Sequence, residues 1–293
     1  MKKKSKSGEL KSPFRYPGGK FYARSLILEH VPEHDCYVEP MCGGASIFFA
    51  KEKAKISILN DADPELVNCL IHIRDYPKKI ADFLEGIPAS KEKHHFFKNE
   101  FKPKNGLERA ARWFYLNRTS YSGIMNMKNC FWGYGDKYSM RPENWRRHLL
   151  ATSVKLQGVF IFNKDFQEIV ESAPLGAFIF LDPPYFNRDQ DKFYAFSFSK
   201  EDHRRLMEVL KKRAKEVKFL LTYDDHPEIR EMYSWADSLL AKEWNYMIYR
   251  TDDQTKEGNG KDKKHNGKRY KGQELFVLNY LSKKEDTQLA LAI

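Results

Sequence analysis

The sequence predicts an α/β fold with a mainly parallel sheet, joined to a mostly helical region. Short apolar runs suited to strands, such as CYVEP and KISILND, alternate with segments of helical spacing. Alternation of this kind predicts successive βαβ units. The run FIFL, from Phe178 to Leu181, is apolar at every position, as expected for a strand of a parallel sheet that is covered on both faces.

The individual elements follow from the same patterns. Helices are expected from Phe21 to His30, in ASIFFAKE and in HRRLMEVLKKRAKE. Strands are expected in CYVEP, KISILND, VFIFNKDF, FIFLDPP, KFLLTYDD and ELFVLNYL. The polar, lysine-rich stretch from Thr255 to Gly272 is expected to be a mobile loop.

The strand pattern pauses after Asp61 and resumes near residue 158. Residues 64–157 are rich in Lys, Arg and aromatic residues and have helical spacing, with a glycine-punctuated hairpin expected at KNCFWGYGDKY. We therefore predict a basic disordered arm at 1–11, one domain formed by 12–63 and 158–293, and a second domain at 64–157.

The net charge favours a polyanionic partner, and nucleic acid is favoured over an acidic membrane surface. The 293 residues carry a formal net charge of +11. Hydrophobic residues make up 41% of the chain, which is enough for a substantial core. No apolar run is long enough to span a bilayer, and MKKKSKS lacks the apolar core of a secretion signal, so a cytoplasmic protein is expected. The four cysteines have neither CxxC spacing nor the density of a disulfide-stapled domain, and we expect reduced thiols without a catalytic role.

No metal site is predicted. His94 and His95 are adjacent, and no further pair of ligands accompanies them at the spacing that a metal requires. The pattern therefore indicates two surface histidines.

The stretch VEPMCGGAS follows the first clear strand and opens a helix. Gly43 and Gly44 allow the backbone to approach a ligand closely, although the full GxGxxG pattern is absent. Asp61 ends the next strand, close to the roughly 20-residue spacing at which a carboxylate binds ribose hydroxyls. The alternative is a simple glycine turn, with Asp61 capping the helix that begins DADPELVN.

The stretch LDPPYF ends a buried strand abruptly. Pro183 and Pro184 fix φ and lack backbone donors, so the chain leaves the sheet along one rigid path. Ligands of open α/β sheets bind beyond the carboxyl ends of the strands, where Asp182 and Tyr185 would face them. The alternative for Asp182 is a helix cap.

Five motifs in this order, FRYPGGK, YVEPMCGGAS, LNDADPELVN, NKDF and LDPPYF, resemble those of the Dam-type (class alpha) DNA adenine-N6 methyltransferases. The resemblance extends from Phe14 to Tyr280 and implies a Rossmann-like methyltransferase domain with a separate target-recognition domain. It also implies S-adenosylmethionine as the cofactor. Carried over by position, the cofactor-binding residues would be Tyr16, Lys20, Glu39, Pro40, Gly43, Gly44, Asp61, Asp165, Phe166 and Asp182. A surface turn is the alternative for Asp165.

The residues of DPPY suit methylation of an amine. The lone pair of the adenine N6 amine is delocalised into the ring, which makes it a poor nucleophile. Asp182 and the carbonyl of Pro183 could each accept one N–H of that amine and aim its lone pair at the methyl group. Pro184 keeps the path rigid, and Tyr185 offers a face on which a flipped-out base stacks. This chemistry needs neither a metal nor a covalent intermediate.

The helical region would then contact DNA. Basic side chains position a protein on phosphates, and an aromatic side chain can enter the space left by a flipped base. The candidates are Arg118, Lys128, Trp132, Tyr134 and Lys137. For any single Arg, a solvated face or a phosphate contact is favoured over base readout. Tyr223 is interpreted either as lining the target-base pocket or as a packing residue.

Together these patterns predict a site-specific enzyme that transfers a methyl group from S-adenosylmethionine to adenine N6 in double-stranded DNA. An RNA adenine-N6 methyltransferase and a non-catalytic DNA-binding protein are the alternatives. Partners would be duplex DNA and, in a restriction-modification role, a cognate restriction endonuclease. The expected location is the cytoplasm of a bacterial or phage-infected cell, at the nucleoid.

Overall fold

The computed structural model describes residues 10–135, 139–186, 198–245 and 271–281. Residues 1–9 of the basic arm predicted at 1–11, the Lys137 candidate and most of the predicted loop at 255–272 lie outside these ranges. The last two residues of that loop belong to a strand that begins at Lys271.

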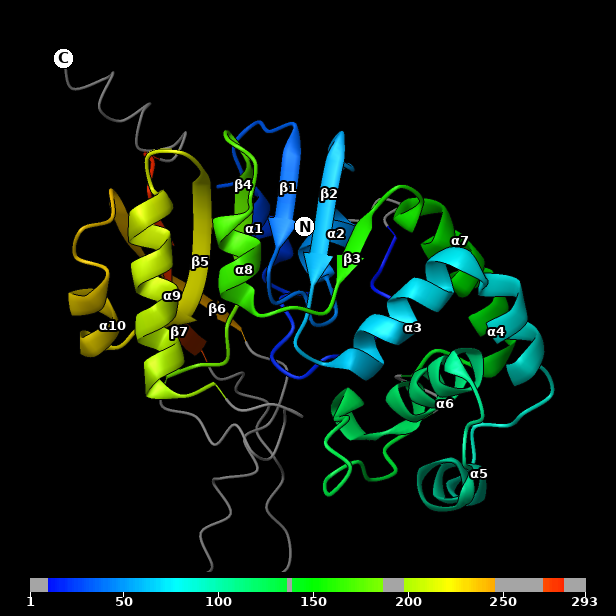
Figure 1. The fold of residues 1–293 in the computed structure, drawn as a ribbon. Helices are drawn as coiled ribbons and strands as arrows, with labels where there is room; N and C mark the ends of the chain where they lie inside the picture. Colours follow the sequence, from blue (N-terminus) through cyan, green and yellow to red (C-terminus); the bar gives the residue numbers. More distant parts are fainter. Residues whose placement is uncertain (1–9, 136–138, 187–197, 246–270, 282–293) are drawn as a thin grey trace, which may run out of the picture.

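A seven-stranded sheet in the order β3-β2-β1-β4-β5-β7-β6 forms the centre of the fold (Figure 1). Pairing is parallel from β3 through β5 and antiparallel at β7 and β6. The strands are β1 (Cys36–Glu39), β2 (Ile56–Asn60), β3 (Phe160–Phe162), β4 (Phe178–Leu181), β5 (Lys218–Asp224), β6 (Ser238–Asn245) and β7 (Lys271–Leu278). The predicted mixed α/β class, with its mainly parallel sheet, is confirmed, while β6 was not anticipated.

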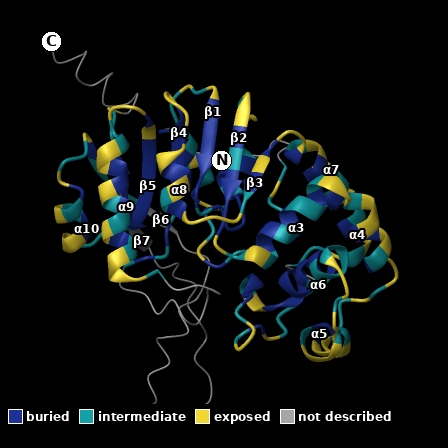
Figure 2. Cartoon of the chain, in the orientation of Figure 1, coloured by how far each residue is buried: buried dark blue, intermediate teal, exposed yellow. Residues whose placement is uncertain are grey.

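Helices cover both faces of this sheet. In Figure 1, α8 (Phe166–Glu171) and α9 (Lys200–Arg213) lie in front of it, whereas α1 (Arg24–Leu28) and α2 (Ser46–Ala50) lie behind it. β1 and β4 are buried along their whole lengths, as a strand covered on both sides must be (Figure 2). α9 begins with a capping box between Ser199 and Asp202. The short α10 (Pro227–Met232) follows β5.

The region between β2 and β3 is helical, as predicted. It contains α3 (Pro64–Asp75), α4 (Pro77–Leu84), α5 (Lys91–His95), a π-helix (Phe96–Glu100), α6 (Gly106–Thr119), two 3₁₀ turns (Tyr121–Gly123 and Pro142–Asn144) and α7 (Trp145–Leu156). In α3, Asp63 caps the N-terminus and Pro64 occupies the first position, where its missing N–H costs nothing.

This helical region shares its core with the sheet. One apolar cluster runs from Phe48 behind the sheet through Leu70 of α3 to Phe114 of α6 and Leu149 of α7. One antiparallel bridge between Ser120 and Trp132 folds residues 120–134 back on the end of α6, so the first arm of this turn lies before the stretch KNCFWGYGDKY in which the hairpin was expected.

Candidate active site

The carboxyl ends of β1, β2 and β4 meet at one edge of the sheet. The strand order reverses between β1 and β4, because the chain places β2 and β3 on one side and β4 and β5 on the other. In open α/β sheets such a switch point leaves a crevice beyond the strand ends. A cavity lies at this point, and we call it the edge cavity.

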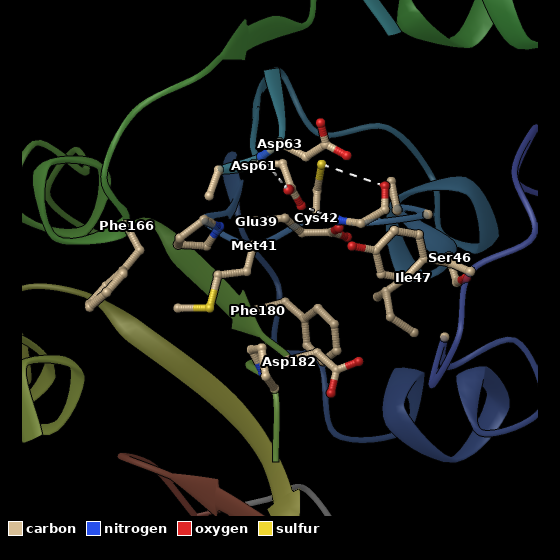
Figure 3. Close-up of a pocket in the computed structure, with 18 of the residues that line it drawn as sticks. Glu39, Met41, Cys42, Ser46, Ile47, Asp61, Asp63, Phe166, Phe180 and Asp182 are labelled. Atoms are coloured by element: carbon tan, nitrogen blue, oxygen red, sulfur yellow. Dashed lines mark hydrogen bonds between the residues drawn. The ribbon is translucent and has the colours of Figure 1, made fainter. Parts of the chain in front are cut away.

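Every residue predicted to bind the cofactor lines the edge cavity (Figure 3). These residues are Tyr16, Lys20, Glu39, Pro40, Gly43, Gly44, Asp61, Asp165, Phe166 and Asp182. Pro184 also lines it. Figure 3 shows Asp61 and Asp182 at opposite ends of the cavity. Segments that are far apart in the sequence are therefore brought to one place by the sheet.

The loop after β1 is shaped by Gly43. Its φ of +45° is in the left-handed region, and a Cβ there would lie 2.7 Å from Cε1 of Tyr16. Its N–H donates to Asp61 Oδ2 at 2.8 Å, which ties the loop to the end of β2. Only glycine combines this backbone angle with so close an aromatic neighbour. The result is a stretch of bare backbone beside the ring of Tyr16.

Two acids of the edge cavity are deeply buried. Burial raises the pKa of Asp61 to about 6, although N–H groups of Asp63 and Gly43 bind its carboxylate and oppose the shift. Burial likewise raises the pKa of Glu39 to about 7. Glu39 accepts the hydroxyl of Tyr37 and the N–H of Phe48, at 2.9 Å for the latter. Glu39 thus anchors α2 to the end of β1.

Asp165 and Phe166 form the outer wall of the edge cavity. Asp165 caps α8 through the N–H of Gln167 at 2.9 Å and pairs with Arg205 at 2.8 Å. Phe166 is 8% exposed, and its ring centroid lies 5.3 Å from that of Phe198. Asp165 therefore caps a helix, unlike the alternative interpretation of a surface turn acid, and it also lines the edge cavity.

Asp182 is held by two neighbours on one of its oxygens. Lys20 Nζ lies 2.5 Å from Oδ1, and Thr222 Oγ1 lies 2.9 Å from the same atom. Lys20 is almost fully buried, and its other N–H groups point at Tyr185 OH (3.0 Å) and Gly18 O (3.3 Å). Among the described residues, none donates to Oδ2 of Asp182. One carboxylate oxygen is thus fixed and the other is left to accept.

The rest of DPPY is packed around this carboxylate. Pro183 is buried and Pro184 is half-buried. Tyr185 is 8% exposed, and its hydroxyl donates to Glu274 of β7. Lys20 also lies 4.9 Å from the centroid of the Tyr185 ring. We call Lys20, Asp182, Tyr185, Thr222 and Glu274 the Lys20 network.

Comparison with known proteins shows the family to which the chain belongs. The family model of the D12 class of N6 adenine-specific DNA methyltransferases matches residues 16–248. The chain belongs to this family. It is therefore an enzyme that methylates adenine N6 in DNA, and its family implies S-adenosylmethionine as the methyl donor.

Individual relatives agree with this assignment. The type II methyltransferase M1.LlaDCHI of Lactococcus lactis subsp. cremoris is 27% identical over 240 residues, 75% of this chain and 84% of that protein. The type II methyltransferase M.CviBI of Paramecium bursaria Chlorella virus NC1A is 28% identical, over 82% of this chain and 93% of its own. The DNA adenine methylase of Escherichia coli K12 is 24% identical, over 78% and 86%.

The methyltransferase places its predicted DNA-contacting residues unevenly. Lys128 is exposed, and Trp132 and Tyr134 are half-buried with ring centroids 5.8 Å apart. Two aromatic residues outside the set of DNA-contact candidates are more exposed: Tyr121 at 48%, and Phe131 of the expected hairpin stretch at 61%. The sequence signal for both is an aromatic residue within a glycine-containing, cationic segment.

Arg118 does not lie where the prediction put it. It is only 6% exposed, and one N–H donates to the carbonyl of Pro13 at 3.4 Å. Burial, with Arg15 nearby, lowers its pKa to about 10. Every residue from Trp113 to Thr119 in this last part of α6 is buried, so no face is left for solvent. In this structure the Arg118 side chain is packed beneath the surface, and its contact with DNA stays a prediction.

The structure also bears on the expectations for His94 and Tyr223. His94 is 4% exposed, and its ring nitrogens contact Thr119 Oγ1 at 2.8 Å and the carbonyl of Cys130 at 3.2 Å, so the prediction of a surface residue was wrong for it. Tyr223 is fully buried beside His203, with 2.6 Å between its OH and Nδ1, which decides for packing. It points to the face of β5 opposite to that of Thr222.

Across the described ranges, no group of three or more His, Cys, Asp or Glu could hold a metal ion. The four cysteines are free thiols and buried. In the same ranges, no helix has the length and apolar character needed to cross a membrane.

Proposed function

We propose that this methyltransferase acts on an adenine swung out of duplex DNA, with S-adenosylmethionine bound in the edge cavity. When bound, S-adenosylmethionine supplies a methyl group on a sulfonium, which leaves as a neutral thioether. The residues of the cavity fit this molecule. The absence of side chains at Gly43 and Gly44 lets Tyr16 lie against the loop at the cavity, and the rings of Tyr16 and Phe166 offer apolar surfaces to the cofactor.

The acids of the edge cavity suit the polar parts of the cofactor. Asp61 is proposed to accept from the ribose hydroxyls, since each of its oxygens keeps a lone pair beyond its bond to a backbone N–H. Asp165 is proposed to hold the cofactor adenine together with Phe166. The loop from Glu39 to Gly44 would lie along the methionine part.

The observation that carries the catalytic proposal is the one-sided fixation of Asp182. Lys20 and Thr222 occupy Oδ1, which leaves Oδ2 to accept one N–H of the target amine. The carbonyl of Pro183 would accept the second N–H, because proline brings an acceptor without a competing donor. Both acceptors draw electron density onto N6 and orient its lone pair, so the rate gain comes from positioning and preorganised electrostatics.

Residues 64–157 are proposed to recognise the DNA target, as a functional unit that shares its core with the catalytic part. Lys128 would contact phosphate, and Trp132 and Tyr134 would approach the flipped base or its vacated place. Extruding a base costs a few kcal/mol, which such contacts must offset. Tyr185 is proposed to stack on the extruded base, with Pro184 holding it in place.

The biological setting is proposed from the relatives. Two of them are named type II methyltransferases, which supports a cognate restriction endonuclease as a partner. Others are named DNA adenine methylase, a name that mentions no restriction-modification type. The cytoplasm of a bacterial or phage-infected cell remains the predicted location.

One experiment tests the proposal. The protein is incubated with labelled S-adenosylmethionine and unmethylated genomic DNA, with total RNA in parallel, followed by nucleoside mass analysis and single-molecule mapping. The expected product is N6-methyldeoxyadenosine at one short motif. Label in RNA alone would show that RNA, and not DNA, is the substrate. DNA binding without label in either polymer would favour a non-catalytic protein.

A further inference from the structure

The last strand carries a buried acid at the end of the sheet that holds the active site. Glu274 of β7 has no exposed surface and accepts the hydroxyl of Tyr185. Its Oε1 lies 3.8 Å from Lys20 Nζ. Glu274 lies outside residues 16–248, the part of the chain that the family model matches.

Strand register explains how this acid reaches the site. β4, β5 and β7 are neighbours in the sheet, and Asp224 of β5 pairs with Glu274 of β7. Side chains alternate along a strand, so Glu274 is on the same face as Phe276. Phe180, Leu220 and Phe276 belong to the apolar cluster of that face. Continuing the same alternation, Asp182, Thr222 and Glu274 form its polar end.

The hydrogen bonds of the Lys20 network depend on one another. Tyr185 has one hydroxyl hydrogen, and donation to Glu274 turns a lone pair of the oxygen toward Lys20 Nζ at 3.0 Å. Lys20 in turn donates to Oδ1 of Asp182. The orientation of Lys20 on Asp182 is therefore linked through Tyr185 to Glu274.

Stability alone is a poor reason for an acid at this position. A carboxylate without exposed surface carries a desolvation cost, and a buried ion pair contributes little net stability compared with apolar residues of the same volume. The four residues that follow Glu274 on β7, from Leu275 to Leu278, are all apolar and fully buried. An acid in this place is better explained by what it orients.

We propose that Glu274 is a positioning residue for methyl transfer: it fixes the hydroxyl of Tyr185 and pairs with Lys20, and so holds Asp182 in its accepting orientation. This inference rests on the roles proposed above for Asp182 and Tyr185. Glu274 needs no contact with DNA or cofactor in order to act in this way.

The test compares Glu274→Gln with Val277→Ala in the full-length protein. Glutamine keeps the shape of the side chain and removes its charge. Val277 is fully buried on the same strand and belongs to the apolar cluster of the opposite face, so its variant destabilises β7 without touching the network. The readouts are the single-turnover rate with genomic DNA, the affinity for S-adenosylmethionine by calorimetry, and the midpoint of thermal unfolding.

Glu274→Gln is expected to slow methyl transfer by up to about 100-fold, as a misplaced catalytic group does, with the affinity for S-adenosylmethionine within about threefold of wild type. Val277→Ala is expected to unfold at a lower temperature and keep a rate within about twofold of wild type. A Glu274→Gln variant with the wild-type rate would overturn the proposal. So would a loss of rate in both variants that follows their loss of stability.

A double-mutant cycle with Tyr185→Phe tests the link itself. If Glu274 acts through the hydroxyl, Glu274→Gln will slow the Tyr185→Phe enzyme much less than it slows the wild type. Effects that simply multiply would contradict the proposed link. Asp182→Asn serves as the reference. An active wild type with an inactive Asp182→Asn variant supports the proposed function, whatever the result for Glu274. An inactive wild type would contradict both the proposed function and the proposal for Glu274.

Discussion

The edge cavity and the segment 120–134 differ in whether their proposed functional side chains are held by other side chains or are exposed to solvent. At the cavity, Asp182 is held by Lys20 and Thr222 through buried hydrogen bonds. In segment 120–134 the backbone is fixed, since Tyr121 N–H donates to the carbonyl of Phe131 at 2.8 Å. Some side chains there are exposed to solvent: Tyr121 is 48% exposed, and Phe131 is 61% exposed with Lys98 Nζ 5.0 Å from its ring centroid.

This difference matches the two functions proposed for these regions, methyl transfer and DNA binding. Transfer to a poor nucleophile requires acceptors held within a fraction of an ångström, so their partners must come from the protein itself. Binding of DNA takes its partners from the DNA, so exposed groups on a fixed backbone suffice. We therefore expect substitutions at the edge cavity to change the rate or cofactor affinity, and substitutions in segment 120–134 to change DNA affinity.

The largest effect is expected for Asp182→Asn. The amide keeps the size of the side chain but replaces one acceptor oxygen with a donor, so the turnover number should fall about 1,000-fold. Affinity for DNA should stay within about threefold. Asp225→Asn, which changes an acid paired with Arg230 after β5, is the control and should keep full activity. Substantial turnover by Asp182→Asn would remove this residue from catalysis.

Gly43→Ala tests whether the edge cavity determines the affinity for the cofactor. A Cβ there would meet the ring of Tyr16 at 2.7 Å in a left-handed backbone, and we expect the affinity for S-adenosylmethionine to fall about 100-fold, measured by calorimetry.

Gly86→Ala is the matched control for Gly43→Ala. Gly86 also has a left-handed φ, of +74°, but nothing lies within 4 Å of its Cβ position. Its variant should lose about 1 kcal/mol of unfolding free energy from the backbone angle alone and bind the cofactor normally. Equal cofactor losses in both variants would show that strain, and not the cavity, is responsible.

Phe131→Ala tests whether segment 120–134 contributes to DNA affinity. Loss of one exposed aromatic contact is worth about 1 to 3 kcal/mol where a base stacks on it, so DNA affinity should weaken about tenfold. Cofactor affinity should not change. The comparison variant is Leu175→Ala, whose side chain is 77% exposed in the loop between α8 and β4 and should leave DNA binding intact. Unchanged DNA affinity in Phe131→Ala would place the interface elsewhere.

Thr222→Val tests a smaller contribution to the Lys20 network. Valine keeps the shape of threonine and removes the hydroxyl that donates to Asp182 Oδ1 at 2.9 Å. Loss of one such bond costs about 1 kcal/mol, so single-turnover methylation should slow about fivefold. A loss of DNA affinity without a loss of rate would contradict the role given to Thr222.

Lys128→Ala should have the smallest effect. If the exposed Lys128 contacts one phosphate, its removal weakens binding of any DNA sequence alike. It should also lower the slope of log affinity against log salt by about 0.9. Titrations at several salt concentrations measure this slope, and an unchanged slope would exclude a phosphate contact.

The cavity-lining residues were predictable because their motifs sit where strands end. VEPMCGGAS, LNDADPELVN and LDPPYF each follow a strand that the apolar runs located correctly, and parallel strands bring their carboxyl ends to one edge. Elements with weaker local patterns were missed. The strand β6 and the short helices α8 and α10 owe their formation to partners elsewhere in the fold.

Side chains of the helical region were harder to place. Arg118 and His94 are polar residues on helices, and their types predict exposure. Arg118 is buried because the end of α6 is covered by Pro13 and by residues 120–134. His94 of α5 is buried against Thr119 of α6 and the carbonyl of Cys130. Which face of a helix is covered depends on neighbours that the sequence does not name.

The sequence by itself determined the chemistry: the acids, glycines and prolines at strand ends, and the cationic, aromatic segment between them. The tertiary structure alone decided which oxygen of Asp182 is free to accept, that Thr222 and not Tyr223 faces it, and that Glu274 reaches Tyr185 and Lys20. The reason is register. Side chains alternate between the two faces of a strand, so a shift of one residue in the pairing of β4, β5 or β7 would exchange these residues for their neighbours.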